Sequence, residues 1–188
     1  DWMVSTFGYD NSFIATSTKV DPVKSPLNYE EKLMVAQQHG VDKDKFVLCR
    51  SPYQPQELIQ KLQYERGLFL EDIAIVFVVG KKDMSENPRF RVGYKKSGMP
   101  TYYQHYGSSQ DLASADTHGY LVVAPHVNFS LPGGIESSGT NLRALLSTAS
   151  PDIFEQAMGF YNPMIDKLFK EKFRGIIMEK KKRGELVL

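Results

Sequence analysis

The chain has 188 residues, a length that suits one domain with its own hydrophobic core. Its 23 basic and 22 acidic residues leave a net charge of +1, so no overall field favours nucleic acid or a membrane surface as a partner. No apolar run is long enough to span a bilayer, no secretory signal is visible, and the single cysteine, Cys49, excludes an internal disulfide. We therefore expect a cytoplasmic protein.

The first half of the chain predicts strands that alternate with helices. Asn28 can cap a helix that ends before Gly40, because Glu30 and Glu31 in its first turn favour the positive end of the helix dipole. The run 73–79 is apolar and rich in β-branched residues, which is typical of a strand buried on both faces of a parallel sheet. The other elements expected here are strands over 13–17 and 46–49 and a helix over 56–66.

The second half predicts two further strands and then three helices. An aromatic run over 101–106 and an apolar run over 120–124 are the expected strands, separated by the loop 107–119. Residues 176–188 are expected to form a charged tail, and its charge run over 179–183 is expected to be a solvated, frayed end. The expected helices cover 140–147, 151–159 and 163–173, and a long exposed loop is expected over 81–98.

This alternation predicts an α/β fold, a Rossmann-like parallel sheet flanked by helices. No internal repeat or low-complexity linker divides the sequence, so we expect one domain over 1–175, followed by the tail. Ligands of such folds collect at the carboxyl edge of the sheet.

The segment Ser-Ser-Gly-Thr-Asn-Leu-Arg over 137–143 has the features of a phosphate site. Ser138 and Thr140 place hydroxyls where a starting helix leaves its backbone N–H groups without acceptors, and Arg143 follows one turn later. The positive end of the helix dipole adds to this preference for an anion. Taken alone, the segment also fits an ordinary capped helix.

A second candidate segment, residues 78–83, covers the end of the apolar strand and the residues that follow it. Gly80 allows close backbone approach, Lys81 and Lys82 supply cations, and Asp83 supplies an acceptor. The segment lacks the further glycine and the Ser/Thr of a P-loop, and a polar strand exit fits it equally well.

No protein-held metal is expected, because the four histidines share no metal-ligand spacing and only one cysteine is present. No G-x-S-x-G elbow occurs, and the carboxylates are scattered.

Three segments together resemble the cytidylyltransferase-like (HxGH) nucleotidyltransferase superfamily, and especially its phage-type, nicotinamide-nucleotide-adenylyltransferase-like members. They are the loop Asp-Pro-x-Lys-x-Pro-Leu over 21–27, the strand end Val-Val-Gly-x-x-Asp over 78–83 and the turn Ser-Gly-Thr-x-Leu-Arg over 138–143. The resemblance implies transfer of a nucleotidyl group, an adenylyl group from ATP, to a phosphorylated acceptor such as a mononucleotide. Pyrophosphate would be released with the help of Mg²⁺, in the cytoplasm, including that of a phage-infected host.

In that family the late turn grips the triphosphate, and a Ser or Ala often stands where this chain has Gly139. The residues implied for the triphosphate are Ser138, Gly139, Thr140 and Arg143, of which Ser138, Thr140 and Arg143 are the catalytic candidates. The residues implied for the rest of the nucleotide pocket are Gly80, Asp83 and Lys24.

The family signature H-x-G-H, on the loop after the first strand, is absent. One interpretation is that the chain starts after that loop, so that 2–4 ends the first helix and 13–17 is the second strand. In another, 3–8 is the first strand. Because those histidines stabilise charge that develops on the triphosphate, we expect this chain to bind nucleotide weakly and to turn over poorly.

Other functions stay open at this point. The missing signature equally favours a non-catalytic descendant that keeps the fold as a nucleotide-binding or assembly module. A third alternative is nucleic-acid binding through Lys95, Lys96 and the basic run 180–183, although the balanced charge argues against it. The sequence sets neither the base nor the acceptor, and it leaves a homo-oligomer open.

Overall fold

The computed structural model describes residues 2–81, 84, 90–107, 112–125 and 130–182, with 176–182 described by backbone alone. The chain divides into two compact units, Asp1–Ala15 with Ser51–Val127, and Thr16–Arg50 with Asn128–Leu188. Such a division is compatible with one domain or with two, so the expected single domain over 1–175 stays a prediction. Within the described part, no helix combines the length and apolar character needed to cross a bilayer.

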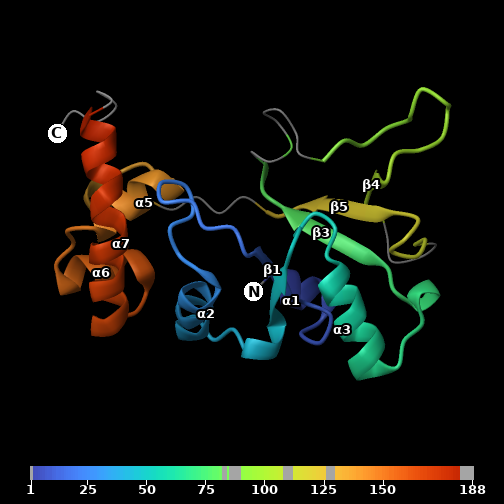
Figure 1. Ribbon diagram of the computed structural model, residues 1–188, viewed down its shortest axis with the longest axis horizontal. Coiled ribbons are helices and arrows are strands. Elements are labelled where there is room, and N and C mark those ends of the chain that lie inside the picture. Colours follow the sequence, from blue (N-terminus) through green and yellow to red (C-terminus); the bar gives the residue numbers. More distant parts are fainter. Residues whose placement is uncertain (1, 82–83, 85–89, 108–111, 126–129, 183–188) are drawn as a thin grey trace. The chain divides into compact units, whose positions relative to one another are not determined.

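A parallel sheet forms the centre of the first unit (Figure 1). Strand β5 (Gly119–Val123) lies between β3 (Ile75–Val79) and β4 (Tyr103–His105), in the order β3-β5-β4. Helices α1 (Trp2–Phe7) and α3 (Gln56–Arg66) belong to the same unit. The ends of β3 are buried and its middle is partly exposed, because β3 is an outer strand of this sheet. The expected burial on both faces is therefore wrong for the middle of the strand.

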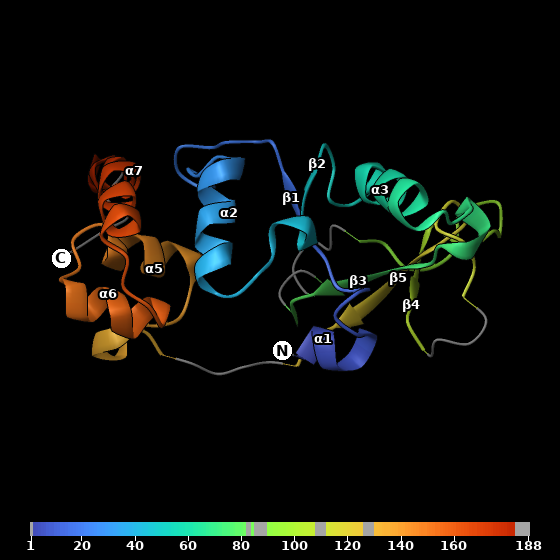
Figure 2. The same ribbon diagram turned by 90° about the horizontal axis from the view of Figure 1, so that it is seen from below.

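Helices dominate the second unit (Figure 2). They are α2 (Tyr29–Gln38), α5 (Gly139–Leu146), α6 (Pro151–Met158) and α7 (Pro163–Lys182). Strand β1 (Ile14–Ser17), which the boundary between the units crosses, pairs with β2 (Phe46–Cys49). Short 3₁₀ turns occur at Lys43–Lys45, Leu70–Asp72 and Pro132–Gly134.

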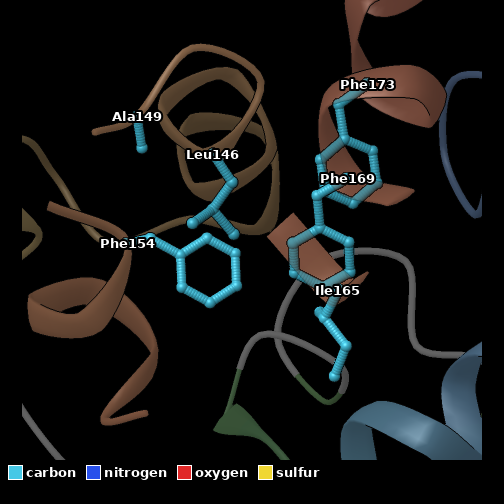
Figure 3. Close-up of a cluster of buried hydrophobic side chains, with 6 residues drawn as sticks. All are labelled: Leu146, Ala149, Phe154, Ile165, Phe169 and Phe173. Carbon is cyan, nitrogen blue, oxygen red and sulfur yellow. The ribbon is translucent and has the colours of Figure 1, made fainter. Parts of the chain in front are cut away.

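One hydrophobic cluster joins the helices of the second unit (Figure 3). Leu146 and Phe154 come from α5 and α6, and Phe169 and Phe173 project from successive turns of α7. Val35 of α2 packs against the same cluster. This burial holds together helices whose chain segments are far apart in the sequence.

The elements follow the sequence expectations closely, and the fold is mixed α/β with a parallel sheet. The interpretation of 3–8 as a strand is wrong, because Trp2–Phe7 is helical. The expectation of a frayed tail is also wrong up to Lys182, because α7 continues through Gly175 to that residue. A single glycine inside a helix costs only about 1 kcal/mol. The loop expected over 81–98 lies partly outside the described residues, and Lys81 and Met84 are helical.

Candidate anion-binding site

Helix α5 begins with two backbone donors that have no acceptor among the residues that the structure describes. Ser138 is its N-cap, and the Ser138 hydroxyl oxygen accepts the Asn141 N–H at 3.1 Å. The first intrahelical bond runs from the Leu142 N–H to the Ser138 carbonyl at 2.9 Å. The N–H groups of Gly139 and Thr140 therefore precede the hydrogen-bond ladder, and neither donates to a residue that the structure describes. No acidic residue occupies this first turn.

The Arg143 side chain folds back over this helix start. A Cβ at position 139 would lie 3.2 Å from Arg143 Nη1, so the guanidinium lies directly beside the Gly139 backbone. Arg143 Nε is buried and has no hydrogen-bond partner among the described residues. Burial lowers the pKa of Arg143 from its usual value, but a guanidinium stays protonated at any physiological pH. A cation at the positive end of a helix is unfavourable unless an anion joins it.

The loop 21–27 supplies a second cation. The Asp21 carboxylate accepts the N–H groups of Val23 and Lys24 at 2.9 and 2.8 Å, and Asp21 and Ser25 exchange two backbone bonds. These bonds hold the loop in a tight turn and lower the pKa of the Asp21 carboxyl. The carboxylate is thus engaged by its own loop, and the Lys24 side chain is exposed.

These groups line one pocket of about 280 Å³ that lies entirely within the second unit. Three cations, Lys24, Lys32 and Arg143, contribute to its lining, and none of its described lining residues is acidic. The other lining residues are Ser25, Pro26, Leu27, Val35, Gly139, Leu142, Leu146, Met158, Phe169 and Phe173. The pocket can therefore hold a small anion with three positive charges and two free backbone donors nearby.

The structure brings together only some of the residues that the sequence nominated. Lys24, Gly139 and Arg143 line the pocket, and Ser138 and Thr140 form the adjoining helix start. Gly80 follows β3 in the first unit and is not among the lining residues, while Asp83 lies outside the described residues.

Sequence reasoning missed Lys32. It lies one turn into α2, where a lysine is usually a solvated surface residue, so only the packing of α2 against the other helices shows its role. Its position after the Asn28 cap gave no signal for a ligand.

A larger pocket of about 440 Å³ in the first unit is a weaker candidate. Its two charged lining residues are engaged by neighbours in the same unit. The Arg66 guanidinium donates to Asn11 Oδ1 and to the Asp10 carbonyl, and Asp72 accepts the Phe69 N–H. Its remaining lining is mostly apolar, so it offers no comparable free charge.

Within the described residues, no group of three His, Cys, Asp or Glu side chains is placed to hold a metal ion. Comparison of the chain with protein-family models, with curated proteins and with solved structures found no match. The nucleotidyltransferase resemblance therefore stays a prediction that rests on the three sequence segments.

Proposed function

We propose that this pocket binds the phosphates of a nucleoside triphosphate, and that the protein is a nucleotidyltransferase with a Rossmann-like fold. The reaction is transfer of a nucleotidyl group, adenylyl if the substrate is ATP, to a phosphorylated acceptor such as a mononucleotide, with release of pyrophosphate. One observation carries the proposal. The loop 21–27 and the turn 138–143, which the resemblance singled out, contribute Lys24 and Arg143 to a single pocket.

The groups in the pocket match what phosphoryl chemistry needs. Arg143 can donate two parallel N–H bonds to one phosphate, and the Gly139 and Thr140 amides are free to donate at the positive end of α5. Negative charge grows on the departing pyrophosphate during transfer, so fixed donors and cations here lower the barrier. Lys24 and Lys32 add charge without fixed geometry.

The donor set of the pocket does not fit a protein-held Mg²⁺. That ion prefers oxygen ligands, whereas the described charged residues that line the pocket are cations. The Mg²⁺ that the resemblance implies would therefore come with the triphosphate, and the cations of the pocket would meet the remaining phosphate oxygens.

A non-catalytic nucleotide-binding module is the second candidate. The pocket favours it, because its described lining residues supply binding groups and include no histidine or carboxylate that could act as an acid or base. The two candidates share the phosphate site and differ in turnover.

A thermal-shift titration with ATP and MgCl₂ tests the shared site. Ligand that binds only the folded state raises the apparent stability, by about 2.7 kcal/mol at a hundredfold excess over Kd. We expect Arg143→Ala to lose most of this gain and Arg174→Ala, on the exposed surface of α7, to keep it. An equal gain in both variants would refute the site.

Pyrophosphate release from ATP and nicotinamide mononucleotide then separates the two candidates. Release that needs Arg143 supports the transferase, and ATP binding without release supports the module.

A further inference from the structure

The outer edge of β3 carries backbone groups that bond to no described residue. On the side of β3 that faces β5, the Val79 carbonyl accepts the Ala124 N–H at 2.9 Å. Peptide groups along a strand point alternately to its two edges, so those of Val76 and Val78 point away from β5. In the part of the chain that the structure describes, no strand pairs with that edge and no group bonds to it.

The sequence of β3 is nevertheless that of an interior strand. Ile75–Val79 reads Ile-Val-Phe-Val-Val, and strands of this composition normally have a neighbour on each edge and cover on both faces. Proteins keep an open edge from pairing with charges, a proline or a bulge. β3 has none of these, and it pairs with β5 residue for residue along its whole length. Its outer edge is therefore open to a further strand.

A pocket of about 440 Å³, here called the edge groove, follows this outer edge. Residues 73–76 and Val78 line it. Successive side chains of a strand point to opposite faces, so lining by consecutive residues means that the groove lies beside the strand and reaches both of its faces. Figure 2 shows α1 and α3 on opposite sides of the sheet. These helices form the walls of the groove, with Met3, Thr6 and Phe7 from α1 and Leu58, Leu62 and Arg66 from α3.

The chemistry of the edge groove favours an extended apolar peptide. Its two charged lining residues, Arg66 and Asp72, are already engaged by neighbours in the same unit. A small apolar molecule would cover the side chains and leave the Val76 and Val78 amides without partners, whereas an extended peptide bonds to both and covers the walls as well. At about 3.3 Å per residue, the stretch 73–78 is about 20 Å long and matches a strand of five or six residues.

A second copy of the chain does not suit this edge. Its own β3 lies between the same two helices, and two identical grooves cannot fill one another. A single extended segment with no helices beside it has no such obstacle.

We propose that the edge groove binds an extended, uncharged apolar segment of another polypeptide, which joins the sheet as a strand beside β3. Backbone bonds to Val76 and Val78 supply affinity, and the walls from α1 and α3 select apolar side chains at successive positions. The groove belongs to the first unit and the anion-binding pocket to the second, so the two proposals can fail separately.

Fluorescence anisotropy of a labelled peptide, titrated with the full chain, gives the first test. The peptide has a Val-Ile-Val-Ile-Val core and a Lys-Lys tag for solubility. N-methylation of all five core residues keeps the side chains and removes the backbone donors, and it should weaken binding at least about tenfold. A Val-Glu-Val-Glu-Val core should also bind at least about tenfold more weakly, because each face of the bound strand meets an apolar wall. No binding of the first peptide, or equal binding of the N-methylated one, would overturn the proposal. Sedimentation that shows a dimer which the peptide cannot dissociate would overturn it in favour of a second copy.

Two variants of α1 give the second test. Thr6 and Ser5 are both exposed, and both hydroxyls donate to the Trp2 carbonyl, at 2.8 and 2.9 Å, but only Thr6 lines the edge groove. Thr6→Glu places a carboxylate against the bound segment and should weaken peptide binding at least about tenfold, whereas Ser5→Glu should change it less than twofold. Equal effects in the two folded variants, with folding checked by their thermal transitions, would contradict the proposal. If Thr6→Glu does not fold, the comparison of the peptides on the unaltered chain decides alone.

Discussion

The missing side chain at position 139 leaves room for the Arg143 guanidinium beside the start of α5. A Cβ there would approach Arg143 Nη1 to 3.2 Å, closer than most real contacts, and it would meet no other atom besides the Arg143 Cζ at 4.0 Å. Gly139 is helical with no positive φ, so its backbone does not require glycine. The space beside Gly139 is therefore occupied by the arginine, and the helix backbone itself does not need a glycine there.

Gly139→Ala is expected to separate stability from binding. Alanine should keep or raise the free energy of unfolding, by up to about 1 kcal/mol, because glycine is a poor helix former. The displaced guanidinium should at the same time weaken ATP binding about threefold to tenfold, since a charged hydrogen bond is worth about 1.5–3 kcal/mol and is only partly lost.

Gly175→Ala is the matched control for this change. Gly175 is an exposed glycine inside α7, and a Cβ there would meet nothing within 4 Å. We expect it to gain stability without any change in ATP affinity. Calorimetry and thermal unfolding of the two variants check both quantities, and an unchanged ATP affinity in Gly139→Ala would show that the contact with Arg143 does not matter.

At the scale of the elements, the bounds of the helices were predictable because residues close in the sequence cap their ends. Asn28 and Glu31 exchange the bonds of a capping box, at 2.9 and 2.8 Å, and Ser138 and Ser150 cap α5 and α6. The sheet order β3-β5-β4 was not predictable, because pairing between distant strands leaves no local mark.

Glu31 also joins two helices of the second unit. Besides capping α2, its carboxylate lies 2.8 Å from the Lys172 ammonium of α7. Burial alone would raise the pKa of Glu31, but the bonds from Lys172 and from the Asn28 N–H outweigh it and lower the pKa below its usual value. A lowered pKa in the folded state means that the stabilisation is present above the ordinary glutamate pKa and is lost as the pH falls through the folded value.

Glu31→Gln should therefore cost about 1 kcal/mol of unfolding free energy at pH 7 and progressively less as the medium becomes acidic. Glu30→Gln, a change of the same kind at an exposed position in the same turn, should cost much less at either pH. Urea unfolding at pH 7 and pH 3.5 measures both. A cost for Glu31→Gln that is the same at the two pH values would contradict the role of its charge.

At the scale of the whole molecule, net charge gave little information about the site. The total of +1 hides a local group of Lys24, Lys32 and Arg143 that faces no acidic lining residue in the described pocket. The turn 138–143 and the loop 21–27 were recognisable in the sequence because their residue types are specific. Lys32 was not recognisable, since ordinary amphipathic helices carry lysines at the same kind of position.

This local charge makes a prediction about salt. Raising NaCl from 0.05 to 0.5 M shortens the Debye length to about 4 Å, so the attraction between the phosphates and the exposed Lys24 and partly exposed Lys32 should be largely screened. We expect ATP affinity to fall about tenfold over this range, whereas the affinity for uncharged adenosine should change little.

Lys32→Met should weaken ATP binding about threefold in low salt, in line with about 0.2–1 kcal/mol for a partly exposed charge pair, and should make the salt dependence shallower. Calorimetric titrations at several salt concentrations measure all of these quantities. ATP affinity that is constant from 0.05 to 0.5 M would mean that the three cations do not meet the phosphates, because a contact between charges at a protein surface cannot be insensitive to screening.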